Sequence, residues 1–147
     1  MSVPWWTSVY SGQEILPLEK HISQDELKKW ADVSGDYNPI HYDMDFAASR
    51  GLSRVVVHGQ LITALLCQML ANWFGAAGCL KKLDVKYKEL SYMGDTIMCR
   101  GLIKKISLDE NLVALEIYAE NQRNKRTATG SAVIQFLSSG YTGDISE

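Results

Sequence analysis

The hydrophobic period changes in the middle of the chain, and this change limits the possible folds more than any other feature. Residues 60–74 are apolar on nearly every side of a helix. After Gln60, larger polar groups interrupt this run only at Thr63, Gln68 and Asn72. A helix without a wide polar face has to be covered by protein. From residue 83 onward apolar and polar residues alternate, which is typical of half-buried antiparallel strands.

Four segments carry the two-residue period, at residues 83–87, 97–106, 113–119 and 128–136. Turn-forming residues separate them, at 93–95, 107–111 and 121–125. This arrangement predicts an antiparallel meander, and a weaker alternation at residues 15–22 predicts one further strand ahead of the helix. The expected fold class is α+β, with an antiparallel sheet wrapped around a long central helix.

Size and composition indicate one globular domain. The 147 residues are 46% hydrophobic and 22% charged, which is enough to bury a core without metals or disulfides. We expect a single domain over residues 1–147, with a core at about 13–137 and a polar tail at 138–147. A sheet covered by one helix leaves its edge strands unpaired, so continuation of the sheet in a homodimer or higher homo-oligomer is expected.

Two short helices are predicted ahead of the central one. Ser23 and Glu26 have the spacing of a capping box, which opens a helix that runs to residue 30 or 31. Residues 43–50 favour a second helix, which Gly51 would end. The segment between these helices should therefore be an ordered loop.

That loop carries the most chemically informative residues of the chain. Asp36 and His41 lie five positions apart on a segment that Pro39 stiffens. A carboxylate and an imidazole held close together can act as an acid/base pair. The spacing alone more often marks a structural turn, in which both side chains only bind backbone groups.

A longer pattern around this pair resembles the MaoC-like, or hydratase 2, branch of the hot-dog fold. That family's motif reads Ser-Gly-Asp-x-Asn-Pro-Leu/Ile/Val-His, followed by Ala or Ser six positions on. It is matched here by Ser34, Gly35, Asp36, Asn38, Pro39, Ile40, His41 and Ala47. A His-Gly pair, His58-Gly59, leads into the central helix as it does in the family. The resemblance spans residues 15–137.

The resemblance implies reversible hydration of trans-2-enoyl thioesters to (R)-3-hydroxyacyl thioesters. Asp36 and His41 would share and activate the water. The backbone N–H of Gly59, at a helix N-terminus, would stabilise the charge on the thioester oxygen, and glycine there would let the acyl group approach. Asn38 would hold the loop or orient the carbonyl.

Three more residues are expected near the substrate. His58 is placed there by the His-Gly motif, although its expected part is to order the turn. Thr63 and Ala64 stand where many relatives carry a serine in the central helix, which puts them near the path of the acyl chain. We therefore group His58, Thr63 and Ala64 with Asn38 as substrate-binding residues.

Several ligands and partners are not expected. Three cysteines without Cys-x-x-Cys spacing disfavour zinc and disulfides, and neither a ligand cluster nor a glycine-rich phosphate loop indicates a metal or redox cofactor. Scattered basic residues and a net charge of -2 disfavour nucleic acid. Residues 1–6 lack a signal-peptide pattern and no run is long enough to span a membrane, which predicts a cytoplasmic protein. Coenzyme A or acyl carrier protein would enter only as part of the substrate.

Two other functions remain open at this stage. Thioester hydrolysis occurs on the same fold and also needs an acidic residue and an oxyanion donor, although an Asp36/His41 pair on one loop argues against it. A non-catalytic acyl-binding subunit of a hot-dog hetero-oligomer is the other alternative. The complete set of Asp36, His41 and Gly59 argues against that function.

Overall fold

The computed structural model describes residues 4–138, so the expected polar tail lies almost wholly outside the described residues. The helices are α1 (Gln24–Ser34), α2 (Met44–Ser49) and α3 (Gly59–Phe74), with short 3-10 turns η1 (Trp5–Ser8), η2 (Pro39–His41) and η3 (Gly75–Ala77). The strands are β1 (Leu18–His21), β2 (Gly78–Tyr87), β3 (Thr96–Ser107), β4 (Leu112–Glu120) and β5 (Arg126–Phe136). All three predicted helices and all five predicted strands are present, although β1 and α2 are shorter than expected and the other elements are longer.

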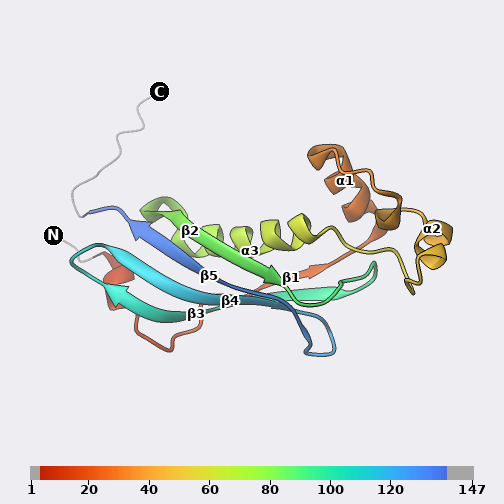
Figure 1. Ribbon diagram of the computed structural model, residues 1–147. Coiled ribbons are helices and arrows are strands. Elements are labelled where there is room, and N and C mark those ends of the chain that lie inside the picture. The colour runs from red at the N-terminus through yellow and green to blue at the C-terminus, as the bar shows by residue number, and fades with distance from the viewer. Residues whose placement is uncertain (1–3, 139–147) are drawn as a thin grey trace, which may run out of the picture.

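The five strands form one antiparallel sheet in the order β1-β3-β4-β5-β2. The sheet is curved, and α3 lies along its inner face, while α1 and α2 stand at one end (Figure 1). The predicted wrapping of a sheet around the central helix is confirmed. The predicted meander is correct only for β3, β4 and β5. Strand β2 pairs with β5 instead of β3, so the turn residues near Gly94 belong to a connection between strands that are not neighbours.

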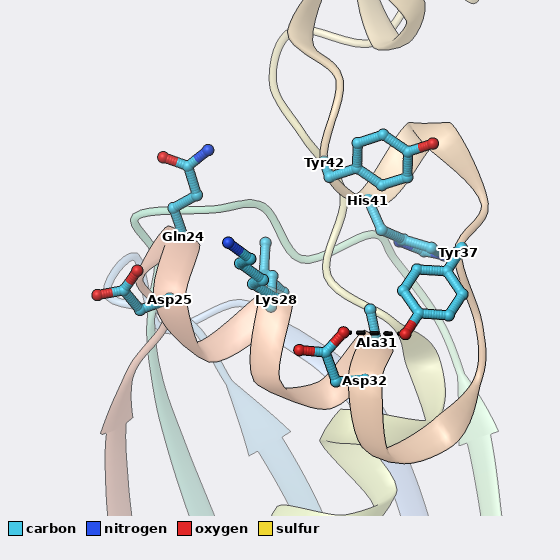
Figure 2. A pocket seen from close by; sticks show the side chains of 9 residues that line it. Gln24, Asp25, Lys28, Ala31, Asp32, Tyr37, His41 and Tyr42 are labelled. Carbon is cyan, nitrogen blue, oxygen red and sulfur yellow. Dashed lines mark hydrogen bonds between the residues drawn. The ribbon is translucent and has the colours of Figure 1, made fainter.

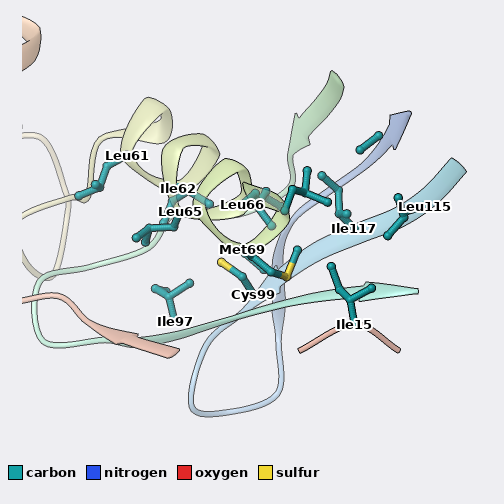
Figure 3. Close-up of a cluster of buried hydrophobic side chains, with 14 of the residues drawn as sticks. Ile15, Leu61, Ile62, Leu65, Leu66, Met69, Ile97, Cys99, Leu115 and Ile117 are labelled. Atoms are coloured by element: carbon teal, nitrogen blue, oxygen red, sulfur yellow. The ribbon is translucent and has the colours of Figure 1, made fainter. Parts of the chain in front are cut away.

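One face of α3 supplies the core. Its buried residues are Leu61, Ile62, Leu65, Leu66, Met69 and Leu70. They pack against inward-facing side chains of β3 and β4, among them Ile97, Cys99, Leu115 and Ile117 (Figure 3). Burying one such side chain contributes about 1.5 to 3 kcal/mol, so this contact holds the helix on the sheet.

The opposite face of α3 is only partly covered by this chain. Gln60, Gln68 and Ala71 are exposed there. Within residues 4–138, Gly59–Ala77 is the one helical stretch with the length and composition of a membrane-crossing helix. Core helices of soluble proteins meet the same criterion, and this one is a core helix along one face.

Local capping sets where the loop with Asp36 and His41 begins. The Ser23 hydroxyl accepts a hydrogen bond from the Glu26 N–H at 3.2 Å, as the capping-box pattern predicts. At the other end of α1, Gly35 has a left-handed conformation with φ 75°, and its N–H donates to the Ala31 carbonyl at 2.8 Å. This glycine turns the chain out of the helix, so Asp36 is the first residue of the loop.

Candidate active site

The loop after α1 is held by its own polar side chains. The Asp36 carboxylate accepts a hydrogen bond from the Asn38 N–H at 3.2 Å. The Asn38 side chain in turn accepts from the Ile40 N–H at 3.3 Å and caps the 3-10 turn that contains His41. Asn38 therefore holds the loop, which is one of the two parts expected for it.

Asp36 and His41 face each other. Asp36 Oδ2 lies 3.7 Å from His41 Nε2, which is too far for a good direct hydrogen bond. His41 Nδ1 lies 2.7 Å from the Val56 carbonyl oxygen. A carbonyl can only accept, so Nδ1 carries a proton, and Nε2 is the ring nitrogen that faces Asp36. The carboxylate is about half exposed, whereas the imidazole is buried.

His58 lies directly behind this pair. Its ring stacks on the His41 ring, with centroids 3.8 Å apart and planes inclined by 19°. His58 Nε2 donates to the backbone carbonyl of Asp36 at 3.1 Å, while Nδ1 is buried without a hydrogen-bond partner. Burial lowers the pKa of His58, and the nearby His41 lowers it further, although hydrogen bonding to Asp36 acts in the opposite direction. The neutral ring is therefore favoured.

The N-terminus of α3 opens beside His41. No side chain caps this end of the helix, and within residues 4–138 no backbone carbonyl accepts from the N–H of Gly59 or Gln60. These two donors, together with the positive end of the helix dipole, suit a developing negative charge.

Tyr87 explains why Gly59 is a glycine. A Cβ added to Gly59 would lie 3.1 Å from Tyr87 Cζ, so the aromatic ring rests on the glycine. The Tyr87 hydroxyl shares a 2.7 Å hydrogen bond with the Thr63 hydroxyl, one turn further along α3. Thr63 therefore supports the ring that covers Gly59.

Two hollows meet at His41. An apolar cavity of about 220 Å³ is lined by His41 and Gly59 together with Ile62, Tyr87 and residues of β5. A larger open groove of about 510 Å³ lies on the other side, between α1 and the loop (Figure 2). Tyr37 and Tyr42 flank this groove, and the Tyr37 hydroxyl donates to Asp32 at 2.9 Å. The candidate active site is therefore reached from two sides.

Three side chains of the site have the composition of a metal site. One ligand atom each of Asp36, His41 and His58 lies within 4.8 Å of the others. A metal ion binds imidazole nitrogen in the plane of the ring, about 2.0 Å away. Two rings stacked face to face cannot both direct a nitrogen at one ion without rotating, and one nitrogen of each already contacts a carbonyl. The arrangement suits an acid/base pair better than a metal centre.

The structure places the predicted site residues unequally around the two hollows. Asp36, Asn38 and His41 belong to one loop, in which Asp36 contacts the other two, and His41 and Gly59 line the apolar cavity, whereas Asp36 and Asn38 line neither hollow. His58, expected among the substrate-binding residues, is 1% exposed and lies behind the candidate pair Asp36 and His41, and it lines neither hollow.

Thr63 and Ala64, which were also expected near the substrate, line neither hollow. Two further contacts of the site could not be predicted from the sequence: the Tyr87 ring on Gly59 and the hydrogen bond from His41 to the Val56 carbonyl. Both depend on tertiary structure. Tyr87 ends an ordinary alternating strand, and Val56 contributes only its carbonyl.

Fold and site together define a hot-dog protein with an Asp/His pair at the N-terminus of its central helix. The model of the MaoC-like domain family matches residues 9–123. The chain belongs to the MaoC-like domain family, as the motif around Asp36 predicted.

Comparison with individual proteins gives the same fold. The chain is 26% identical over 119 residues to the (R)-specific enoyl-CoA hydratase of Aeromonas caviae, which covers 80% of this chain and 89% of that protein. It superposes on the solved structure of the (R)-hydratase from A. caviae involved in PHA biosynthesis with a TM-score of 0.83, covering 88% of this chain and 98% of that one at 26% identity. The predicted hot-dog fold is confirmed.

A plant relative is similar over a shorter stretch. The mitochondrial 3-hydroxyacyl-[acyl-carrier-protein] dehydratase of Arabidopsis thaliana is 29% identical over 97 residues, which is 66% of this chain. The match spans 57% of the length of the plant protein. Both named relatives are lyases, the enzyme class that the resemblance implied.

Proposed function

We propose that this protein is a lyase that adds water reversibly to trans-2-enoyl thioesters and forms (R)-3-hydroxyacyl thioesters. One observation carries this function: Oδ2 of Asp36 and Nε2 of His41 are 3.7 Å apart and face each other. A water oxygen can lie within about 2.8 Å of both atoms. Its two hydrogens would then point at two acceptors, and its own lone pair would point at the substrate.

The reaction moves one proton and forms one C–O bond. As the water oxygen attacks the β-carbon, an O–H bond of the water breaks, and either Asp36 or His41 accepts the proton. An equivalent proton is returned to the α-carbon, so the site ends in its starting protonation state. Acid/base help of this kind contributes about 10²- to 10⁴-fold in rate.

Charge develops on the thioester oxygen during the attack. The unpaired N–H of Gly59 lines the cavity next to His41 and can donate to that oxygen. Loss of one such donor in other enzymes costs about 3 to 4 kcal/mol. The apolar walls of the same cavity, among them Ile62 and Ala128, suit the acyl group.

The direct test is an enoyl-thioester assay that also follows free thiol. Purified protein is mixed with crotonyl-CoA and with a longer trans-2-enoyl-CoA, and absorbance of the conjugated thioester is recorded. Loss of absorbance without thiol release supports hydration, whereas thiol release shows a thioesterase. Binding of the acyl-CoA without either signal identifies a non-catalytic subunit and refutes the lyase function.

The oligomer that we propose is a homodimer joined through β2. This strand is ten residues long and lies at one edge of the sheet, with Leu80 and Tyr87 exposed. A long unpaired edge tends to pair with a second strand. Sedimentation analysis tests this assembly: a monomer at micromolar concentration would refute it, and Lys82→Pro in β2 should weaken the dimer.

A further inference from the structure

A second, polar cavity adjoins the apolar one. Its volume is about 610 Å³, and it lies where the hairpin between β4 and β5 approaches the segment before β3. Glu89 and Leu90 line both cavities, so the polar cavity is the next space along from the candidate active site. Three cations also line it: Arg54, Arg123 and Lys125.

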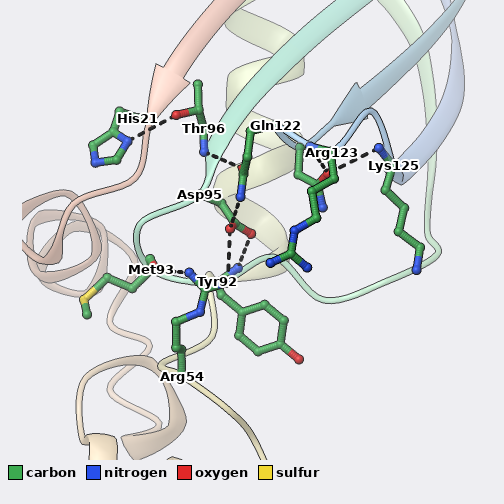
Figure 4. A network of polar contacts seen from close by, with 10 residues as sticks. His21, Arg54, Tyr92, Met93, Asp95, Thr96, Gln122, Arg123 and Lys125 are labelled. Carbon is green, nitrogen blue, oxygen red and sulfur yellow. Dashed lines mark hydrogen bonds and ion pairs between the residues drawn. The ribbon is translucent and has the colours of Figure 1, made fainter.

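Arg54 is held in place by contacts with the segment before β3. Its guanidinium donates to the Met93 carbonyl at 3.1 Å and to Asp95 at 3.4 Å, and it lies over the Tyr92 ring at 5.3 Å (Figure 4). A guanidinium has five N–H donors, so several remain for a ligand after these two contacts.

The hairpin that presents the other two cations is also held in place. The Asn121 side chain accepts hydrogen bonds from the N–H groups of Arg123 at 2.9 Å and Lys125 at 3.2 Å. Gln122 donates to Asp95 at 3.0 Å, which connects the hairpin to the same carboxylate that Arg54 contacts. One polar network therefore orders both walls of the cavity (Figure 4).

The charges in the cavity are not balanced. Glu89 pairs with Lys125 at 3.0 Å, and Asp95 is 2% exposed with Arg54 as its partner. Arg123 enters no ion pair with any other residue of the described chain. Three cations and two carboxylates leave one positive charge, which suits an anion that arrives from outside.

We propose that the polar cavity binds the phosphate of the pantetheine carrier, with Arg123 and Arg54 as its donors. This inference rests on the proposed function, since it assigns the outer part of the same thioester substrate. In a pantetheine thioester the phosphate is separated from the sulfur by a long flexible arm. Its binding site is therefore expected outside the space that holds the reacting carbons, and the polar cavity adjoins that space at Glu89 and Leu90. Coenzyme A and acyl carrier protein share this phosphate.

The test compares two thioesters that carry the same acyl group. Crotonyl-CoA has the phosphates, whereas crotonyl-N-acetylcysteamine has the thioester and amide without them. Arg123→Gln should lower kcat/KM for crotonyl-CoA about tenfold, mainly through KM, and leave the value for the truncated thioester unchanged. Lys104→Gln is the matched control, because Lys104 is an exposed sheet lysine that pairs with Glu116 at 3.4 Å outside this cavity.

The possible results distinguish failure of the phosphate site from failure of the lyase function. If wild-type protein turns over the thioesters but Arg123→Gln affects both equally or neither, the phosphate site is refuted and the lyase stands. If wild-type protein turns over neither, calorimetric binding of free coenzyme A decides: weaker binding to Arg123→Gln than to wild type supports the site, and equal binding refutes it. The same comparison of wild type and Arg123→Gln with crotonyl-loaded acyl carrier protein shows for which carrier the turnover depends more on Arg123.

Discussion

The imidazole of His58 donates a hydrogen bond to the backbone carbonyl of Asp36 at 3.1 Å, so the residue ahead of α3 holds the carboxylate-bearing loop. The same ring stacks on His41. His58 therefore contacts both members of the candidate catalytic pair and lies outside both hollows. We infer that His58 is a positioning residue, which acts through Asp36 and His41.

Two replacements of His58 distinguish its hydrogen bond to the Asp36 carbonyl from its stacking on His41. Glutamine can place an N–H near the position of Nε2, whereas phenylalanine keeps a ring against His41 and has no donor. We expect His58→Gln to retain most of the activity, and His58→Phe to lower kcat about tenfold with little change in KM, because the Asp36 carbonyl loses its donor. Steady-state kinetics check this. Equal kcat values for the two variants would contradict the positioning role.

The lowered pKa of His58 predicts that stability depends on pH. In the unfolded chain this imidazole takes up a proton below about pH 6.5, while burial in the fold opposes the charge. The unfolded state therefore binds more protons, and the free energy of unfolding falls as the pH drops from about 6.5 toward the lowered value. Denaturant unfolding between about pH 7.5 and pH 5.5 measures this, and His58→Gln should show a smaller decrease. An equal decrease in both proteins would assign the effect to other groups.

Gly59→Ala should separate stability from activity. The new methyl group would meet the Tyr87 ring at 3.1 Å, but that ring is 54% exposed and can move outward. Because alanine also favours the helix, we expect the free energy of unfolding to change by less than about 1 kcal/mol. The methyl and the displaced ring intrude on the cavity, so kcat/KM should fall roughly ten- to a hundredfold. Thr63→Val, which only removes the partner of the Tyr87 hydroxyl, should cost less activity; the reverse order would contradict this role of Gly59.

The three cysteines should react in a fixed order. Cys79 is exposed, and burial raises the pKa of the half-buried Cys67. Burial raises the pKa of Cys99 to about 12, and this thiol faces the core. A thiol reagent near neutral pH should therefore modify Cys79 first, Cys67 more slowly and Cys99 only after unfolding. Mass mapping of a labelling time course checks this, and early modification of Cys99 in native protein would contradict the packing of β3.

Much of the fold could be predicted because periodicity records burial directly. The alternation in 113–119 and the apolar run in 60–74 identify one strand and the central helix almost residue by residue. Strand order is a different property. Nothing local in residues 78–87 shows that β2 pairs with β5, because antiparallel partners are selected by the three-dimensional path of the connection through Gly94.

The site could be predicted where its residues are close in sequence. Asp36, Asn38 and His41 share one loop, and their turn chemistry is local. The covering of Gly59 by Tyr87 joins α3 to the end of β2, and the hydrogen bond from His41 to Val56 uses a carbonyl that every residue has. A contact between two distant elements and a hydrogen bond to a backbone carbonyl cannot be predicted from residue type or spacing.

If Asp36 and His41 activate one water, the Asp36→Asn variant should lose the hydration rate. Asparagine keeps the oxygen that accepts from the Asn38 N–H, so the loop should persist while the proton acceptor is lost. Asp32→Asn, which changes the same charge on α1 beside the Tyr37 hydroxyl, is the control. We predict that crotonyl-CoA hydration falls about 10²- to 10⁴-fold in Asp36→Asn and stays near wild type in Asp32→Asn. An unchanged rate in a folded Asp36→Asn variant would contradict the account.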